Sequence, residues 1–384
     1  MKYNLHISIF IFIGLIMIAL NCGKKQDSLK LKSKELLYNE SKLTPKQKLG
    51  KKVFFDDNLS TPVGMSCASC HSPETAFVNP NYSIPVSQGV HKDRFGNRND
   101  LTAAYASFIP NFHYDKEKKS YVGGLFWDGR AVDLIEQAKG PFLNPLEMSN
   151  PDINSIMEKI RNSDYTDLFK EVFGKNALEN ADEAYSKVAE AITEYEKSSE
   201  LNQFNSKYDL YLKGKVELTE QEKRGLLIFE NKGECISCHP NKPGSDESPP
   251  LFTDYTYDNL GLPKNPENPY YYLPKELNPE GIKFVDLGLG KTVKKKEENG
   301  KFRVPTLRNI SKTAPYMHNG IFKNIRQVVV FYNTRDIGLW PKPEIPENIN
   351  RKELGNLGLS EQEIDDIVAF LKTLDDNYIP KENK

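Results

Sequence analysis

The sequence has no large excess of charge of one sign, and its longest hydrophobic run is short. The 52 Lys and Arg residues nearly balance the 53 Asp and Glu residues, for a formal net charge of -1. This balance argues against a surface that binds nucleic acid or adsorbs broadly to membranes. The apolar run "LHISIFIFIGLIMIAL", residues 5–20, is too short for a comfortable transmembrane helix and is typical of a secretory signal.

A cysteine and a polar stretch follow this run. The segment "ALNCGKKQDS" places Cys22 where a bacterial lipoprotein carries its lipid, although Asn21 is bulkier than the residue usual before that cysteine. We therefore predict a lipoprotein-type signal over 1–22 and a tether over 23–42. The alternative is an ordinary cleaved signal with an incidental cysteine. Both readings place the mature protein in the periplasm, outside the cytoplasm.

Cysteine itself is rare, and its placement is specific. The chain has five cysteines, and four of them form "CASCH" at 67–71 and "CISCH" at 235–239. A redox-active disulfide or a zinc site could use such pairs, but zinc-binding pairs lie closer together in sequence, and neither explains the histidines. Covalent attachment of c-type haem explains all six residues, because two thiols bind the vinyl groups and the adjacent imidazole ligates iron. The predicted haem-binding residues are Cys67, Cys70, His71, Cys235, Cys238 and His239.

The rest of the chain is predicted to be mainly α-helical, and its 38% apolar residues can form a sizeable core. Thr44 and Pro45 begin one helix, "INSIMEKI" and "DEAYSKVAEAITEYEKSS" predict two more, and possible capping boxes at Thr219 and Ser360 begin two others. Nine prolines from Pro240 to Pro279 predict an ordered loop. We expect two cytochrome-c-like domains with long ordered loops and one haem each, over 43–213 and 214–384.

Three longer motifs point to a family. "FWDGRA", "GPFLNPLEM" and "FRVPTLRNISKTAPYMHNG" resemble the bacterial dihaem cytochrome c peroxidases and their MauG-type relatives, and the resemblance extends from about Leu43 to Leu374. It implies that the haem of His71 is the peroxidatic one and that the haem of His239 stores or relays electrons.

The resemblance also assigns the acid that moves protons. Glu147 matches the acid of the distal pocket, with Gln137 beside it. Heterolytic cleavage of peroxide requires a proton to leave one oxygen and reach the other, and a carboxylate above the iron can carry it. The alternative is that Glu147 only caps or salt-bridges a surface turn.

Trp127 and a calcium position follow from the same resemblance. The family places the counterpart of Trp127 between the haems, where an indole can relay an electron, although a buried tryptophan is more often core. Asn99, Thr313 and Pro315 match the interdomain site of one calcium ion. Here "RNDLTAAY" departs from the usual RN-Ala-Pro, and an ordinary loop junction is the alternative.

Two axial ligands remain open in the sequence. His91 falls where activation-dependent peroxidases keep a second ligand to the first iron in the resting state, yet it also fits a surface loop. For the haem of His239, the segment match places Tyr332 in the ligand slot, as in MauG-type enzymes. Met317 is the runner-up, and Tyr332 would then merely pack at a helix end.

The leading functional hypothesis is a dihaem peroxidase that reduces hydrogen peroxide with electrons from a small donor such as a cytochrome c or cupredoxin. One alternative is a MauG-type oxidase that acts on a protein side chain. Another is a dihaem electron carrier without peroxide chemistry, although a carrier has no need of Glu147 and Gln137. The donor is not identified by the sequence, and neither is the oligomeric state, for which a homodimer is left open.

Overall fold

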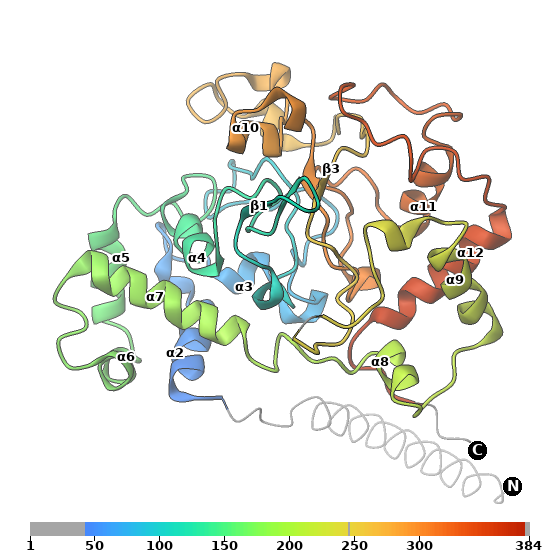
Figure 1. Ribbon diagram of the computed structural model, residues 1–384. Helices are drawn as coiled ribbons and strands as arrows, with labels where there is room; N and C mark the ends of the chain where they lie inside the picture. The colour runs from blue at the N-terminus through green and yellow to red at the C-terminus, as the bar shows by residue number, and fades with distance from the viewer. Residues whose placement is uncertain (1–42, 245, 381–384) are drawn as a thin grey trace, which may run out of the picture. The chain divides into compact units, whose positions relative to one another are not determined.

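The computed structural model describes residues 43–244 and 246–380 (Figure 1). The described residues from Thr44 onward form one compact unit. Cys22, the predicted signal and the tether lie outside the described residues. Within the described part, no helix combines the length and apolar character needed to cross a membrane.

The unit is helix-rich, as predicted. Its α-helices are α2 (Pro45–Phe54), α3 (Cys67–Cys70), α4 (Leu134–Leu143), α5 (Ile153–Arg161), α6 (Thr166–Phe173), α7 (Ala181–Glu196), α8 (Lys207–Leu212), α9 (Glu220–Glu230), α10 (Leu289–Val293), α11 (Ile325–Thr334) and α12 (Glu361–Leu371). Short strands form two antiparallel pairs, β1 (His113–Asp115) with β2 (Ser120–Val122) and β3 (Tyr257–Asp258) with β4 (Phe302–Arg303). Residues 240–279 contain no α-helix in their described part, which agrees with the predicted loop.

Side-chain caps fix where the main helices begin. Thr44 caps α2 in a reciprocal capping box with Gln47, and Pro45 is the first helical residue. Thr219 and Ser360 make the same box at the starts of α9 and α12. In each case a side-chain oxygen accepts a backbone N–H that the helix cannot satisfy itself. The three predicted helix starts are therefore confirmed.

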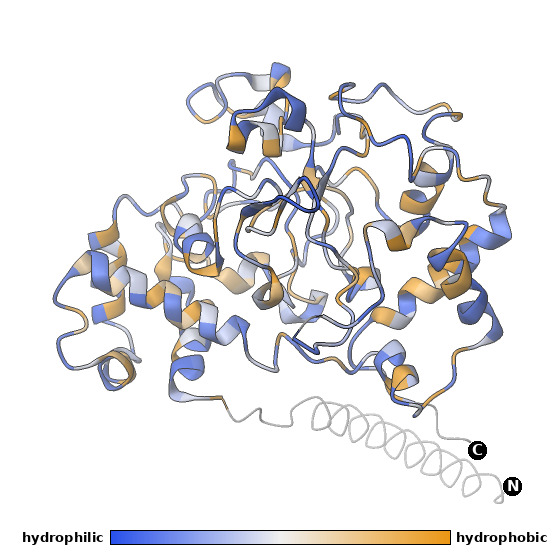
Figure 2. Ribbon diagram, in the orientation of Figure 1, coloured by the Kyte–Doolittle hydropathy of each residue, from blue (hydrophilic) through white to orange (hydrophobic). Residues whose placement is uncertain are grey.

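Two helix pairs form two hydrophobic cores. In the first core α2 packs against α7, and in the second α9 packs against α12. Apolar residues, orange in Figure 2, recur along these helices. A Cβ at Gly50 would overlap the carbonyl oxygen of Ala191, and a Cβ at Gly225 would overlap that of Asp366. Glycine thus permits the same close crossing in both cores.

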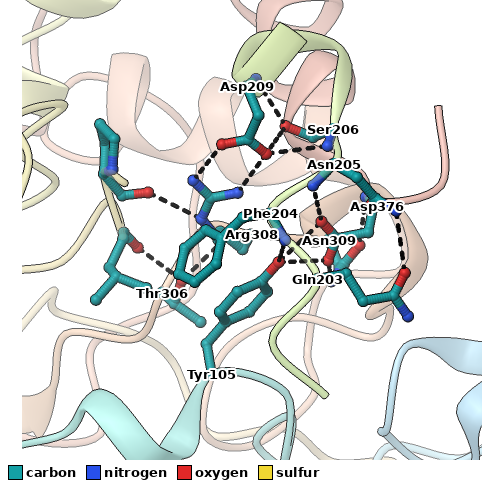
Figure 3. Close-up of polar contacts among 12 residues, drawn as sticks. Tyr105, Gln203, Phe204, Asn205, Ser206, Asp209, Thr306, Arg308, Asn309 and Asp376 are labelled. Carbon is teal, nitrogen blue, oxygen red and sulfur yellow. Dashed lines mark hydrogen bonds and ion pairs between the residues drawn. The ribbon is translucent and has the colours of Figure 1, made fainter. Parts of the chain in front are cut away.

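A buried polar network joins segments that are far apart in sequence (Figure 3). The Arg308 guanidinium donates to both carboxylate oxygens of Asp209, at 2.8 and 2.9 Å, and both side chains are buried. Nearby, the Tyr105 hydroxyl donates to Asp376 at 2.7 Å and accepts the backbone N–H of Phe204 at 3.0 Å. Because Tyr105 belongs to the first core while Asp376 follows the last helix, these bonds hold the C-terminal segment against the first half of the chain.

Candidate functional site

Two cavities lie next to the two cysteine motifs. The first cavity, about 1270 Å³ with its mouth included, is lined by Cys67, Cys70 and His71. The second cavity, about 1700 Å³ on the same measure, is lined by Cys235, Cys238 and His239. Each predicted haem-binding motif therefore faces a large cavity of its own.

The histidines are oriented as metal ligands require. The Nδ1–H of His71 donates to the carbonyl oxygen of Phe77 at 3.0 Å, and that of His239 donates to Phe252 at 2.7 Å. Since a carbonyl only accepts, each Nε2 carries a free lone pair. Burial also lowers the pKa of His239, which favours its neutral form. A backbone carbonyl on the outer nitrogen is the usual partner of an iron- or zinc-binding imidazole.

The four cysteines are poor candidates for thiolate chemistry. None forms a disulfide. Burial raises the pKa of Cys67 and of Cys235 to about 12, and raises that of Cys238 to about 12 as well. Free thiols there would stay protonated, which disfavours a nucleophile. No group of three His, Cys, Asp or Glu side chains suited to a metal ion occurs among the described residues. The donor set fits haem attachment better than the alternatives.

Glu147 and Gln137 line the first cavity together with His71. Gln137 projects from α4, and Glu147 lies in the turn that follows this helix. The Asn144 side-chain amide donates to Glu147 Oε1 at 2.7 Å. Burial and, to a lesser extent, the nearby Asp100 carboxyl raise the pKa of Glu147 to about 7, against the lowering effects of Arg130 and Asn144. A carboxyl with a pKa near neutrality can both accept and release a proton.

Trp127 lies in the wall that the two cavities share. Its side chain lines both of them, as do Asn99 and Arg303. The indole Nε1–H donates to the Asn99 carbonyl at 2.7 Å, and the Arg303 N–H donates to the Trp127 carbonyl at 2.8 Å. The first bond holds the indole ring and the second holds the Trp127 main chain, and the role of Trp127 as an electron relay stays a prediction.

Both rival ligands reach the second cavity. Tyr332 from α11 and Met317 each line it, together with His239. No hydrogen bond of the Tyr332 hydroxyl occurs within the described residues, and burial raises the pKa of this phenol well above its ordinary value. Without a metal the phenol is therefore neutral. The arrangement leaves both Tyr332 and Met317 available, and the choice of Tyr332 stays a prediction.

The predicted calcium residues come together beside Trp127. Asn99 Nδ2 donates to the Pro315 carbonyl at 2.5 Å and to the Met317 carbonyl at 3.3 Å, while the Thr313 hydroxyl donates to Ile310. Converging carbonyls are ligands that Ca²⁺ prefers, but the amide nitrogen, which cannot bind a cation, points at them. The residues fit calcium only with this amide reversed, so calcium stays a prediction.

His91 is not brought into the first cavity. It is half-buried on the loop between Ser87 and Gly96, and it is not among the residues that line the cavity. The loop is tied to the Glu147 segment, because the Val90 N–H donates to the Glu147 carbonyl at 2.9 Å. His91 therefore does not line the cavity that His71 lines, and its ligation of the first iron stays a prediction.

Sequence reasoning missed several residues of the cavity walls. Asp100 lines both cavities and accepts a hydrogen bond from Ser87, and Arg98 pairs with Asp286 through two bonds of 2.7 and 2.8 Å. Glu196, at the end of α7, lines the first cavity. The replacement of the usual Ala by Asp100 was a visible signal, but its position in the wall depends on the fold.

The chain is similar to known proteins over most of its length. The family model for di-haem cytochrome c peroxidase matches residues 44–217. The methylamine utilization protein MauG of Paracoccus denitrificans is 36% identical over 85% of this chain and 88% of its own. The cytochrome c551 peroxidase of Pseudomonas aeruginosa is 33% identical over 79% of this chain and 76% of its own. The crystal structure of the dihaem peroxidase BthA from Burkholderia thailandensis covers 88% of this chain and 87% of its own, at 33% identity and a TM-score of 0.75.

The chain therefore belongs to the dihaem cytochrome c peroxidase and MauG family. Peroxidases and MauG proteins both occur among its relatives, so membership alone does not choose between the two activities.

Proposed function

We propose that the chain binds one c-type haem in each cavity. Thioether bonds to Cys67 and Cys70 hold the first, and bonds to Cys235 and Cys238 hold the second. The Nε2 atoms of His71 and His239 ligate the irons. The proposal is supported by the two cavities and by the carbonyl-bonded Nδ1 atoms of both histidines.

The reaction proposed is reduction of hydrogen peroxide to water. Haem in the first cavity supplies an iron that binds peroxide and exchanges electrons. The observation that carries the proposal is the Glu147 carboxyl, whose pKa of about 7 suits proton transfer in the cavity that also holds His71. Glu147 takes a proton from one peroxide oxygen and returns it to the other, and Gln137 orients the substrate through its amide.

Electrons come from a small donor protein, such as a cytochrome c or a cupredoxin, in the periplasm. Trp127 relays them between the cavities because its indole lines both. Cys22 carries a lipid that holds the protein at a membrane. A calcium ion at Asn99, Thr313 and Pro315 completes the proposed cofactors.

A second candidate function is supported by Tyr332. A phenolate ligand in the second cavity would stabilise oxidised iron and favour a MauG-type oxidase that withdraws electrons from a protein side chain. Tyr332 lies on the wall of that cavity, and its hydroxyl forms no hydrogen bond within the described residues. This placement supports the MauG-type alternative.

Steady-state kinetics with hydrogen peroxide and a reduced cytochrome c test the leading proposal. The loaded protein should oxidise the cytochrome in a peroxide-dependent manner, and Glu147→Gln should lower turnover by about 100-fold or more. Peroxide consumption without oxidation of any offered donor would favour the MauG-type alternative. A protein that exchanges electrons with the cytochrome but leaves peroxide intact would be a carrier, and the proposed activity would be wrong.

A further inference from the structure

The last residue of α7 is a buried carboxyl that the proposed reaction does not use. The Glu196 residue is 5% exposed and lines the first cavity, and its Oε2 atom has no hydrogen-bond partner among the described residues. One turn earlier, Thr193 is 4% exposed and its Oγ1 is likewise without a partner in the described chain. Leaving buried polar atoms unpaired costs free energy, so two on adjacent turns require an explanation.

The second core supplies an internal comparison. Gly50 packs against Ala191 and Tyr195, and Gly225 packs in the same way against Asp366 and Phe370. These contacts allow the pair α2 and α7 to be aligned residue by residue with the pair α9 and α12. In this alignment two pairs of residues that line the cavities are of the same type: Phe54 aligns with Phe229, and Ile192 aligns with Ile367.

The polar pair breaks this correspondence. Glu196 corresponds to Leu371, which lines the second cavity, and Thr193 corresponds to Val368. The second core thus places two apolar side chains where the first core places a carboxyl and a hydroxyl. Packing of the helix pair does not require the polar residues, because the second core packs without them.

We propose that Glu196 is a redox-linked proton acceptor of the first cavity, which binds a proton when the haem held by His71 gains an electron. This inference depends on the proposed haem binding and not on peroxidase activity. An added electron lowers the charge near Glu196, which disfavours its carboxylate form. The Glu196 carboxylate then takes one proton from solvent, so that an O–H bond of a hydronium ion breaks and an O–H bond forms on Glu196, while the electron comes from the donor. With Leu371 in the equivalent place, the second cavity has no carboxyl at this position; its unpaired buried carboxyl oxygen, Oε1 of Glu344, comes from a different segment.

The electrostatic surroundings of Glu196 suit this role. Burial raises the pKa of its carboxyl to about 8, so that both protonation states are accessible near neutral pH. Cys67, on α3, lies close to Glu196, because the Glu196 carboxylate is, after burial, among the causes that raise the pKa of the unmodified Cys67 thiol. Other charged or ionisable groups on the cavity wall are His71, Arg98, Asp100, Arg130, Glu147 and Arg303. On the helices packed against α7, five lysines have partners other than Glu196: Lys46 with Glu190, Lys51 with Glu200, Lys52 with Asp164, Lys139 with Glu136 and Lys159 with Ser60; the remaining one, Lys48, is exposed.

Redox-difference infrared spectroscopy of the haem-loaded protein near pH 8 tests the proposal. Reduction of the first haem should add a carbonyl-stretch band of a protonated carboxylic acid, and oxidation should remove it. Glu196→Gln, which keeps the shape of the side chain, should abolish this band. Glu196→Leu, which reproduces Leu371, should abolish it as well and provides a second variant if the amide perturbs the cavity.

Glu147→Gln is the matched control, since it removes the other carboxyl of the same cavity. The band should survive in this variant. A band that persists in both Glu196 variants, or that disappears only in Glu147→Gln, would overturn the assignment, as would the absence of any such band in the loaded wild type. Because the visible spectrum reports haem binding in the same sample, failure of haem loading is distinguished from failure of the proton assignment.

Discussion

At the scale of single residues, the proposed chemistry depends on the protonation of Glu147. Its carboxylate must accept the first proton from peroxide, and burial raises the pKa of this carboxyl to about 7. The reactive form is therefore depleted below this pH and predominates above it. We predict that kcat/KM for peroxide rises with pH through about 7, and that Glu147→Gln loses this dependence together with most of the activity. A pH profile of unchanged shape in the variant would show that another group carries the proton.

Tyr332 decides the character of the second site. If its phenolate ligates the iron, Tyr332→Phe should change the near-infrared and paramagnetic resonance spectra of the haem held by His239. A methionine ligand raises the reduction potential and a phenolate lowers it. A methionine-to-ferric charge-transfer band that is present in the wild type and survives Tyr332→Phe would assign the ligand to Met317. Met317→Leu is the paired variant, and it should leave the spectra unchanged if tyrosine is the ligand.

Some residue roles could be predicted from the sequence, and others depended on the fold. Each CxxCH motif is local in sequence, so spacing alone indicated its chemistry. Glu196 lies in "ITEYEKSSE", which resembles a solvated helix end, and only the crossing of α7 over α2 buries it. For His91 the sequence left both a ligand and a surface-loop residue open, and in the structure His91 does not line the first cavity, so its ligation of the iron stays a prediction.

At the scale of elements, the close crossings of α2 with α7 and of α9 with α12 restrict most strongly which residues the helices can carry. Helix starts were predictable because Thr44, Thr219 and Ser360 act on residues three positions away. The pairing of α2 with α7 was not, since it brings together helices more than a hundred residues apart. The sequence signal for these pairings was one glycine in α2 and one in α9. The role of each glycine is recognised only once the fold shows which backbone carbonyl of the partner helix it approaches.

Gly50→Ala should therefore destabilise the first core. Its added methyl would overlap the Ala191 carbonyl, so α2 and α7 must separate, at a cost of about 1–3 kcal/mol in the free energy of unfolding. Chemical denaturation of the loaded protein measures this cost. Gly140→Ala in α4 is the control, because its Cβ would lie 3.6 Å from Phe126 and alanine is favourable within a helix. Equal stability of the two variants would contradict the proposed close crossing.

At the scale of the whole molecule, the two cavities share a wall that includes Trp127, whose indole and carbonyl are hydrogen-bonded to Asn99 and Arg303. Trp127→Phe should preserve peroxide cleavage in protein that is already reduced, but should slow electron transfer from the second cavity to the first. Stopped-flow spectroscopy can follow each haem separately after mixing with peroxide. If transfer between the cavities kept its rate, Trp127 would be a structural residue of the wall and not a relay.

The central claim is that both cavities hold covalently attached haem, and intact-protein mass spectrometry after denaturation tests it most directly. Protein produced with a cytochrome c maturation system should carry the added mass of two haems. Changing Cys235 and Cys238 to serine should reduce this to one haem, retained by Cys67 and Cys70. Wild-type protein that carries one haem, or that contains zinc and no haem, would contradict the account.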